Sequence, residues 1–222
     1  MPLAPPTWAG GVGRNTAYAT RSTCSIAVTR SGDPRGGLAP RPPGGLAGLM
    51  DHHDLLTDAA RRPVDSARQA LAGIDPETLN RMPEGRHSSI AWLIWHAARQ
   101  QDVQIAELAG TDDVWRAAGW ADRFGLDRPA DAMGFGDGPA EIAAVRVDDA
   151  GILEGYLGAV VDRACDYIDG LSSADLDDIV DRRWDPPVTR GVRLVSTIDD
   201  AVAHVAQAQY LRGLLADWSI GY

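Results

Sequence analysis

Four long stretches of the chain repeat their apolar residues with the 3.6-residue period of an amphipathic helix. They span about residues 51–72, 88 or 89–109, 150–170 and 196–218, and they are separated by irregular stretches at 110–149 and 181–195. Almost no segment shows the apolar–polar alternation of a half-buried strand. Long amphipathic helices with two long connections are typical of a four-helix bundle with crossover loops. The pattern therefore predicts an all-α fold.

Capping and breaking residues indicate where helices begin, end or bend. Ser196-Thr197-Ile198-Asp199 has the form of a capping box and predicts the start of the last long helix. Asp75-Pro76-Glu77 and Thr111-Asp112-Asp113 predict the starts of two short helices. Pro63 lies inside the first long helix and is expected to kink or split it, because proline donates no backbone hydrogen bond.

Residues 1–49 differ from the rest of the chain in composition. They hold seven of the 14 prolines and nine of the 24 glycines, together with five arginines and one aspartate, and they have no apolar period. Such a segment cannot bury enough apolar surface to offset its chain entropy, so we expect a disordered tail. It lacks the apolar run of a secretory signal. We interpret it as an upstream extension or a mis-assigned start, with residues 50–222 as the folded domain.

The charge balance excludes several classes of partner. The chain has 31 acidic residues against 21 arginines and no lysine, a net charge of -10, and 30 of those acids lie after residue 49. This balance argues against binding to nucleic acid or to an anionic membrane surface. No stretch reaches the ~20 apolar residues of a membrane-spanning helix. Cys24 and Cys165 form no metal-binding or disulfide pattern, which fits a cytoplasmic location, and Cys165 has the setting of a buried apolar residue.

The five histidines are the main candidates for chemistry. His52 and His53 lie at the start of the first helix and are expected to be solvated, and His87 is expected in a loop. His96 and His204 lie deep within helical patterns, on the second and the last long helix. These two are therefore the histidines expected to point into the bundle.

On the last helix, a carboxylate and an imidazole share one face. Asp200 and His204 are four residues apart, in line with an apolar stripe that is expected to face inward. The stripe consists of Asp200, His204, Gln207, Leu211, Leu215 and Trp218. Such a pair can chelate a metal ion, and His96 on a facing helix would supply a third ligand. The alternative is a core histidine hydrogen-bonded to Asp200, and the spacing alone leaves both open.

Several segments resemble the DinB-like superfamily, in particular an actinobacterial branch of it. The most specific is Ser89-Ile90-Ala91-Trp92-Leu93-Ile94-Trp95-His96-Ala97-Ala98-Arg99-Gln100-Gln101-Asp102, which looks like the second helix of that superfamily. Similar stretches are Gly119–Leu126, Trp184–Thr189 and Asp200–Gln207. The resemblance covers about residues 50–222.

The resemblance implies a four-helix bundle that holds a divalent ion of the zinc, nickel or manganese class. His96 matches the ligand of the second helix, and Asp200 with His204 match the carboxylate-x3-His pair of the fourth. Several relatives are thiol S-transferases or isomerases, the mycothiol-dependent maleylpyruvate isomerase among them. The implied function is transfer of a small thiol, such as mycothiol, to a small electrophile.

Two other classes of function stay open at this point. One is a non-catalytic bundle, a homodimer or stress-related module with a degenerate metal site, because Asp200 is shorter than the glutamate of the isomerase type. The other is a hydrolase that uses the same metal to activate water. Aromatic residues could line a substrate pocket, although core packing is the simpler role for most of them; they are Trp92, Trp95, Trp115, Trp120 and Tyr156.

Deleting residues 1–49 should leave the melting temperature of the domain unchanged within error. Their composition gives them no apolar surface to contribute to a core. Thermal denaturation of the full chain and of residues 50–222 measures this directly. A drop of several degrees in the shorter chain would contradict it.

Overall fold

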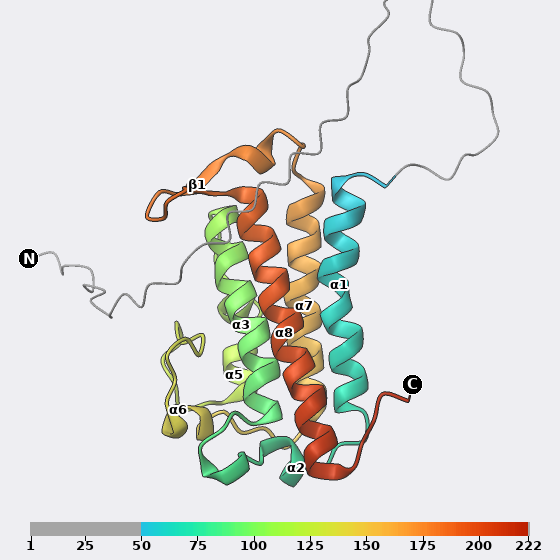
Figure 1. The fold of residues 1–222 in the computed structure, drawn as a ribbon. Helices are drawn as coiled ribbons and strands as arrows, with labels where there is room; N and C mark the ends of the chain where they lie inside the picture. The colour runs from blue at the N-terminus through green and yellow to red at the C-terminus, as the bar shows by residue number, and fades with distance from the viewer. Residues whose placement is uncertain (1–49, 222) are drawn as a thin grey trace, which may run out of the picture. The chain divides into compact units, whose positions relative to one another are not determined.

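The computed structural model describes residues 50–221, drawn in colour in Figure 1. Every prediction made for residues 1–49 lies outside the described residues. Within 50–221, no helix is long and apolar enough to cross a membrane. The elements are α1 (His52–Leu71), α2 (Pro76–Asn80), η1 (Pro83–Gly85), α3 (Ile90–Ala109), α4 (Val114–Ala117), α5 (Trp120–Phe124), α6 (Pro139–Ala143), α7 (Ala150–Asp169), η2 (Asp175–Asp177), β1 (Ile179–Asp181), β2 (Val188–Thr189) and α8 (Arg190–Ala216).

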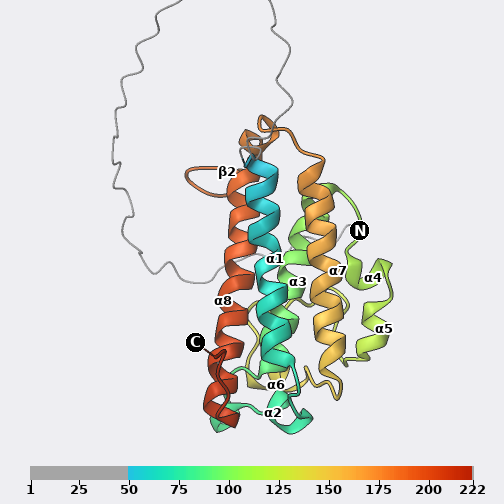
Figure 2. The same ribbon diagram turned by 90° about the vertical axis from the view of Figure 1, so that its right-hand side faces the viewer.

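The four long helices form a bundle, which confirms the predicted fold class. α3 packs against α7 and α8, and α1 packs against the same two helices on the other side. Figures 1 and 2 show that α1 and α8 run in one direction while α3 and α7 run in the other. Two consecutive long helices that run parallel need a connection that returns along the bundle. Residues 110–149, which carry α4, α5 and α6, are that connection.

Several helix boundaries agree with the local sequence signals. Ser89 caps α3 by accepting a hydrogen bond from the backbone of Trp92, and Gly110 ends the helix in the left-handed conformation. Asp75 caps α2, and Asp113 caps α4. At these three helices the local signal and the tertiary packing agree.

The predicted start of the last helix is wrong by about two turns. α8 begins at Arg190, and Thr189 is its cap. The hydroxyls of Ser196 and Thr197 instead donate to the carbonyls of Val192 and Leu194 inside the helix. Because Leu194 is fully buried, tertiary packing extends the helix past the local capping signal.

Two further expectations need correction. Pro63 does not split α1, which is continuous from His52 to Leu71; its ring is buried, so packing offsets the missing backbone hydrogen bond. The region 181–195 is not wholly irregular, since β1 and β2 pair as a short antiparallel hairpin and α8 begins at residue 190. An ion pair from Asp181 to Arg193 fastens this hairpin to α8, and a second ion pair, from Asp181 to Arg183, lies within the hairpin.

α3 is the helix at the centre of the fold. Every residue from Ile90 to Asp102 is buried, because α7 and α8 cover its inner sides and the 110–149 connection covers the rest. This includes the charged Arg99 and Asp102, which a surface helix would keep in water. Buried charges of this kind persist only when every polar atom has a partner.

Asp102 supplies many of those partners. Its carboxylate accepts hydrogen bonds from the backbone N–H groups of Val114 and Trp115 at the start of α4, at 2.8 and 2.9 Å. It also accepts from the Tyr156 hydroxyl at 2.7 Å and from Arg99 at 3.3 Å. One buried carboxylate therefore joins α3, α4 and α7.

Replacing Asp102 with alanine should lower the free energy of unfolding by about 3–5 kcal/mol, because it leaves the buried Arg99 cation without a main partner. Urea denaturation measures the change. Asp58→Ala is the control, since Asp58 makes only an exposed ion pair with Arg62 on α1. Equal losses in the two variants would contradict a special role for the buried carboxylate.

Candidate metal centre

The predicted triad comes together between α3 and α8. His96, Asp200 and His204 each offer one ligand atom, and these atoms all lie within 4.8 Å of one another. The two imidazole rings meet edge to face, with ring centroids 4.6 Å apart. The His204 Nε2 atom lies 3.6 Å from the Asp200 Oδ1 atom. The predicted convergence of His96 and His204 is thus present.

The tautomer of His96 follows from its surroundings. Its Nδ1 atom is hydrogen-bonded to the backbone carbonyl of Met133, which can only accept, so the proton sits on Nδ1. The Nε2 lone pair of the neutral ring is then free. Burial lowers the pKa of His96, which favours that neutral form.

His204 has the same pattern of partners. Its Nδ1 atom lies 3.1 Å from the side-chain oxygen of Gln207, which accepts from an N–H group. Its Nε2 atom is turned toward Asp200, and the nearby carboxylate raises the pKa of His204 above its ordinary value. Both histidines therefore use Nδ1 for an oxygen acceptor and leave Nε2 for the shared site.

The loop that carries Met133 lies directly on α3. Gly134 has a φ of +94°, and a Cβ atom there would lie 2.6 Å from His96 Nδ1, so only glycine allows this approach. Trp92 stacks on the His96 ring, with centroids 4.7 Å apart. The Trp92 indole N–H also donates to the Asp137 carboxylate at 2.8 Å, which ties the loop to the same helix.

A buried ion pair fixes the far end of that loop. Arg128 donates to Asp137 at 2.8 Å, and both side chains are almost fully buried. Burial alone would raise the pKa of Asp137, but the hydrogen bonds from Arg128 and Trp92 outweigh it and lower that pKa. Apart from the glycines that mark a loop, no feature of the sequence points to these positioning residues.

The face of α8 that points inward differs from the predicted stripe. The buried positions are Leu194, Thr197, Ile198, Ala201, Val205, Ala208, Leu211 and Arg212. Asp200 and His204 lie at the edge of this face, and Gln207 is exposed. Side-chain exposure rises from His204, at 19%, to Asp200, at 41%, so the triad opens to solvent on the α8 side.

The other histidines take structural or loop positions. His87 is exposed in a loop, as expected. His52 and His53 are only half-exposed, contrary to expectation, and the His53 Nε2 atom bonds to the carbonyl of Leu171. These two form a second His/Asp group with Asp51, but Asp51 is occupied in capping α1, where the helix dipole disfavours a cation.

The remaining candidates belong to the core. Cys165 is buried, and burial raises the pKa of its thiol. Both observations agree with the interpretation of Cys165 as a small apolar residue. Trp92, Trp95, Trp115 and Tyr156 are buried and pack in the main apolar cluster. Trp120 is partly buried against that cluster, in contact with the Tyr156 ring.

Comparison with known proteins settles the family. Residues 58–210 match the model of the DinB superfamily. The chain belongs to this superfamily. A chain of known structure, described as the conserved protein of a locus from Enterococcus faecalis, is 37% identical to this chain, with a TM-score of 0.72. That match covers 77% of this DinB-superfamily chain and 100% of the other chain. A comparison with curated proteins found no match.

The two histidines should titrate on opposite sides of the ordinary histidine pKa of about 6.5 in chelator-treated protein. Burial lowers the value for His96, and Asp200 raises the value for His204. Nuclear magnetic resonance of the imidazole resonances measures both. Asp200→Asn should shift the pKa of His204 downward more than that of His96. A larger shift at His96 would contradict the geometry described.

Proposed function

We propose that His96, Asp200 and His204 bind a divalent metal ion of the zinc, nickel or manganese class. The observation that carries this proposal is that one ligand atom from each of the three residues lies within 4.8 Å of the others. Each imidazole Nδ1 atom is already bonded to an oxygen acceptor, which leaves Nε2 for a ligand. Such oxygen partners orient metal-bound histidines and fix their tautomers. The set of donors suits a borderline metal ion.

The Asp200 carboxylate adds an independent test of fit. Its Oδ2 atom is buried and has no hydrogen-bond partner among the described residues. An unpartnered buried carboxylate oxygen is costly, and with two neutral histidines the site would gather only lone pairs. A cation satisfies all three groups together, whereas a proton satisfies only the His204–Asp200 pair.

We further propose that the bound ion serves a thiol S-transferase. If His96, Asp200 and His204 held a divalent cation, the ion would supply Lewis-acid chemistry that lowers the pKa of a nearby thiol. The partly exposed Asp200 marks the side from which a small thiol, of the mycothiol type, and its electrophile would enter. The reason for preferring this chemistry to hydrolysis is the resemblance of the chain to thiol S-transferases of the DinB-like superfamily.

The chain's own residues have defined roles in this proposal. Met133 and Gln207 hold the Nδ1 protons, so neither histidine can rotate without losing a hydrogen bond. Trp92 covers one face of the His96 ring and keeps water from it. The low pKa of His96 keeps that ligand neutral at cytoplasmic pH, and the site accordingly suits the proposed intracellular thiol chemistry.

Removing His204 should abolish both bound metal and the stabilisation that depends on it. In wild-type protein that stabilisation should be about 3–4 kcal/mol at metal concentrations 100 to 1,000 times the dissociation constant. His204→Ala should instead melt at the same temperature with metal or with chelator. Elemental analysis and thermal denaturation with zinc, nickel or manganese measure both effects.

His87→Ala is the matched control, because His87 is exposed in a loop and should leave metal binding intact. If His204 were only a hydrogen-bonded residue, its loss would cost about 1–3 kcal/mol with or without metal. Metal-dependent consumption of thiol in the presence of a haloarene tests the transferase. If the protein binds metal but consumes no thiol, the proposed metal site stands and the proposed transferase activity is contradicted.

A further inference from the structure

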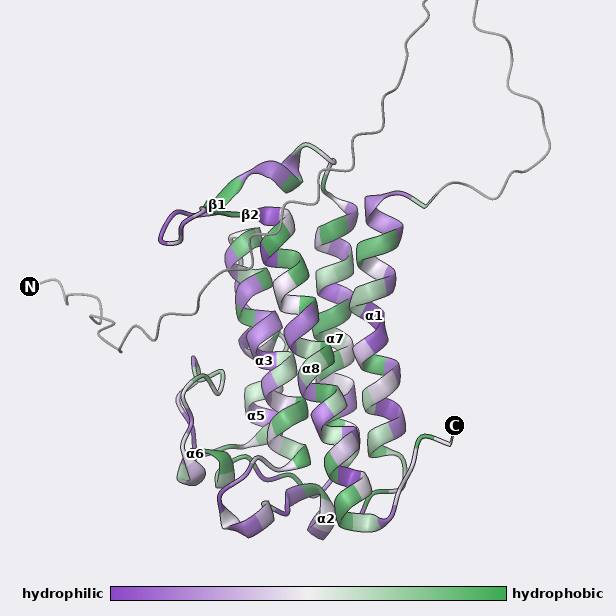
Figure 3. Ribbon diagram, in the orientation of Figure 1, coloured by the Kyte–Doolittle hydropathy of each residue, from purple (hydrophilic) through white to green (hydrophobic). Residues whose placement is uncertain are grey.

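A pocket of about 400 Å³ lies between α3 and the 110–149 connection. Its walls come from Trp95 of α3, Trp115 of α4 and residues between 121 and 130, and it shares no residue with the candidate metal centre. Figure 3 shows that the loop from α5 to α6 carries both hydrophilic and hydrophobic residues. Small-molecule sites are concave, have volumes of about 300–1,000 Å³ and combine apolar walls with a few polar groups. The size and lining of this pocket fit that description.

Two buried hydrogen-bond donors at this pocket have no acceptor among the described residues. They are the indole Nε1–H group of Trp95 and the Nε–H group of Arg128. Trp95 is 1% exposed and the Arg128 side chain is 8% exposed, so both lie at the inner end of the pocket. The Arg128 Cζ atom lies 4.8 Å from the centroid of the Trp95 ring, which places the two donors in one small region.

Packing alone does not account for these two donors. A phenylalanine at position 95 would also place an aromatic ring in the core, and it would bury no unpaired donor. The other donors of Arg128 are occupied, since Nη1 donates to the Glu141 carbonyl and Nη2 to the Asp137 carboxylate. Buried polar groups in native proteins nearly always have a partner. The acceptor for these two is therefore expected from a bound molecule.

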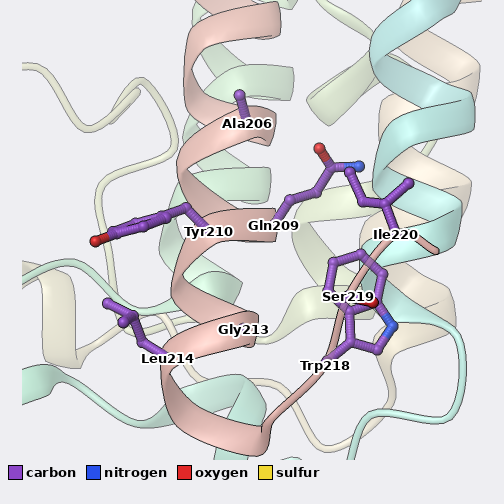
Figure 4. Close-up of a pocket in the computed structure, with 8 residues that line it drawn as sticks. All are labelled: Ala206, Gln209, Tyr210, Gly213, Leu214, Trp218, Ser219 and Ile220. Carbon is purple, nitrogen blue, oxygen red and sulfur yellow. The ribbon is translucent and has the colours of Figure 1, made fainter. Parts of the chain in front are cut away.

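The groove at the C-terminal end of α8 lacks this feature. Figure 4 shows Tyr210 and Leu214 on one side of it and Trp218 on the other. Its Gln209 side chain donates to the Ser66 carbonyl, and no described residue that lines the groove has a buried donor without a partner. Apolar walls alone do not specify a ligand, whereas a pair of buried donors does.

We propose that the pocket at Trp95 and Arg128 binds a small planar amide. The carbonyl oxygen of the amide accepts hydrogen bonds from these two side chains, and its aromatic or apolar part lies against the Trp115 ring. Asp122 also lines the pocket and is exposed, so it stands at the rim. Its carboxylate accepts from the amide N–H group.

The charges around the pocket select an uncharged ligand over a carboxylate. The Asp137 carboxylate lies 2.8 Å from Arg128 and already compensates the guanidinium. Asp122 adds a negative charge at the rim, and the whole chain carries a net charge of -10. A carboxylate entering this pocket loses its hydration and gains little net attraction. An amide supplies the same carbonyl oxygen without that cost.

Titration of the full-length, chelator-treated protein with benzamide tests the proposal. Nuclear magnetic resonance follows the assigned indole N–H resonances. The Trp95 indole proton should move downfield, because it gains an acceptor, with a dissociation constant of about 1 mM or lower. Benzoate has the same ring and a carboxylate in place of the amide, and it should bind at least about tenfold more weakly.

Trp95→Phe isolates the indole donor, because phenylalanine keeps an aromatic ring and removes the N–H group. It should raise the dissociation constant of benzamide by about fivefold or more, measured at the backbone amide of Leu126, which also lines the pocket. Trp120→Phe is the matched control, since Trp120 packs on Tyr156 in the same aromatic cluster without lining the pocket, and it should bind as the wild type does. Circular dichroism and melting temperature establish that both variants fold.

The wild-type titration decides the matter even if Trp95→Phe does not fold. A Trp95 indole resonance that stays in place throughout would overturn the proposal. Benzoate binding as tight as that of benzamide would overturn the choice of an uncharged ligand. Changes confined to the His96 and His204 resonances would place benzamide at the candidate metal centre instead of this pocket. Because the protein is metal-free, each result is independent of whether the triad binds an ion.

Discussion

The buried guanidinium of Arg99 is the constraint on which the 110–149 connection and the candidate metal centre depend. Arg99 is fully buried at the middle of α3, and an arginine cannot lose its charge in a protein. Its N–H groups must all find oxygen acceptors inside the molecule. Asp102, Tyr156 and the backbone carbonyls of Ala130 and Ala132 accept hydrogen bonds from it, and the buried Asp113 carboxylate lies 3.5 Å away.

Those two carbonyls link the core to the candidate metal centre. Once Arg99 has fixed Ala130 and Ala132, the next carbonyl, that of Met133, meets His96 one turn earlier on the same helix. Gly134 then passes the His96 ring at a distance that no side chain would permit. A single buried cation thereby determines where the 110–149 connection lies and which His96 nitrogen carries the proton. The orientation of the candidate ligand is thus a consequence of core electrostatics.

The features that could be predicted from the sequence are mostly those that depend on residues close together in the chain. The caps at Ser89 and Asp113 and the stop at Gly110 act within a turn, and the four periodic stretches define the bundle. The pairing of His96 with Asp200 and His204 could be predicted because helical spacing and family resemblance pointed to the same residues. The start of α8 could not, because the burial of Leu194 depends on packing between distant segments.

α8 serves both the core and the candidate site, and Gln207 lies where the site meets solvent. The buried side of α8, with Ala201 and Val205, packs in the core, and its edge carries Asp200 and His204. Gln207 accepts a hydrogen bond from His204 and is itself exposed. Hydrogen bonds strengthen when water is excluded from them. The hydrogen bond that orients His204 is exposed to water, whereas the bond from His96 to the Met133 carbonyl is part-buried, so His96 is the more firmly oriented of the two histidines.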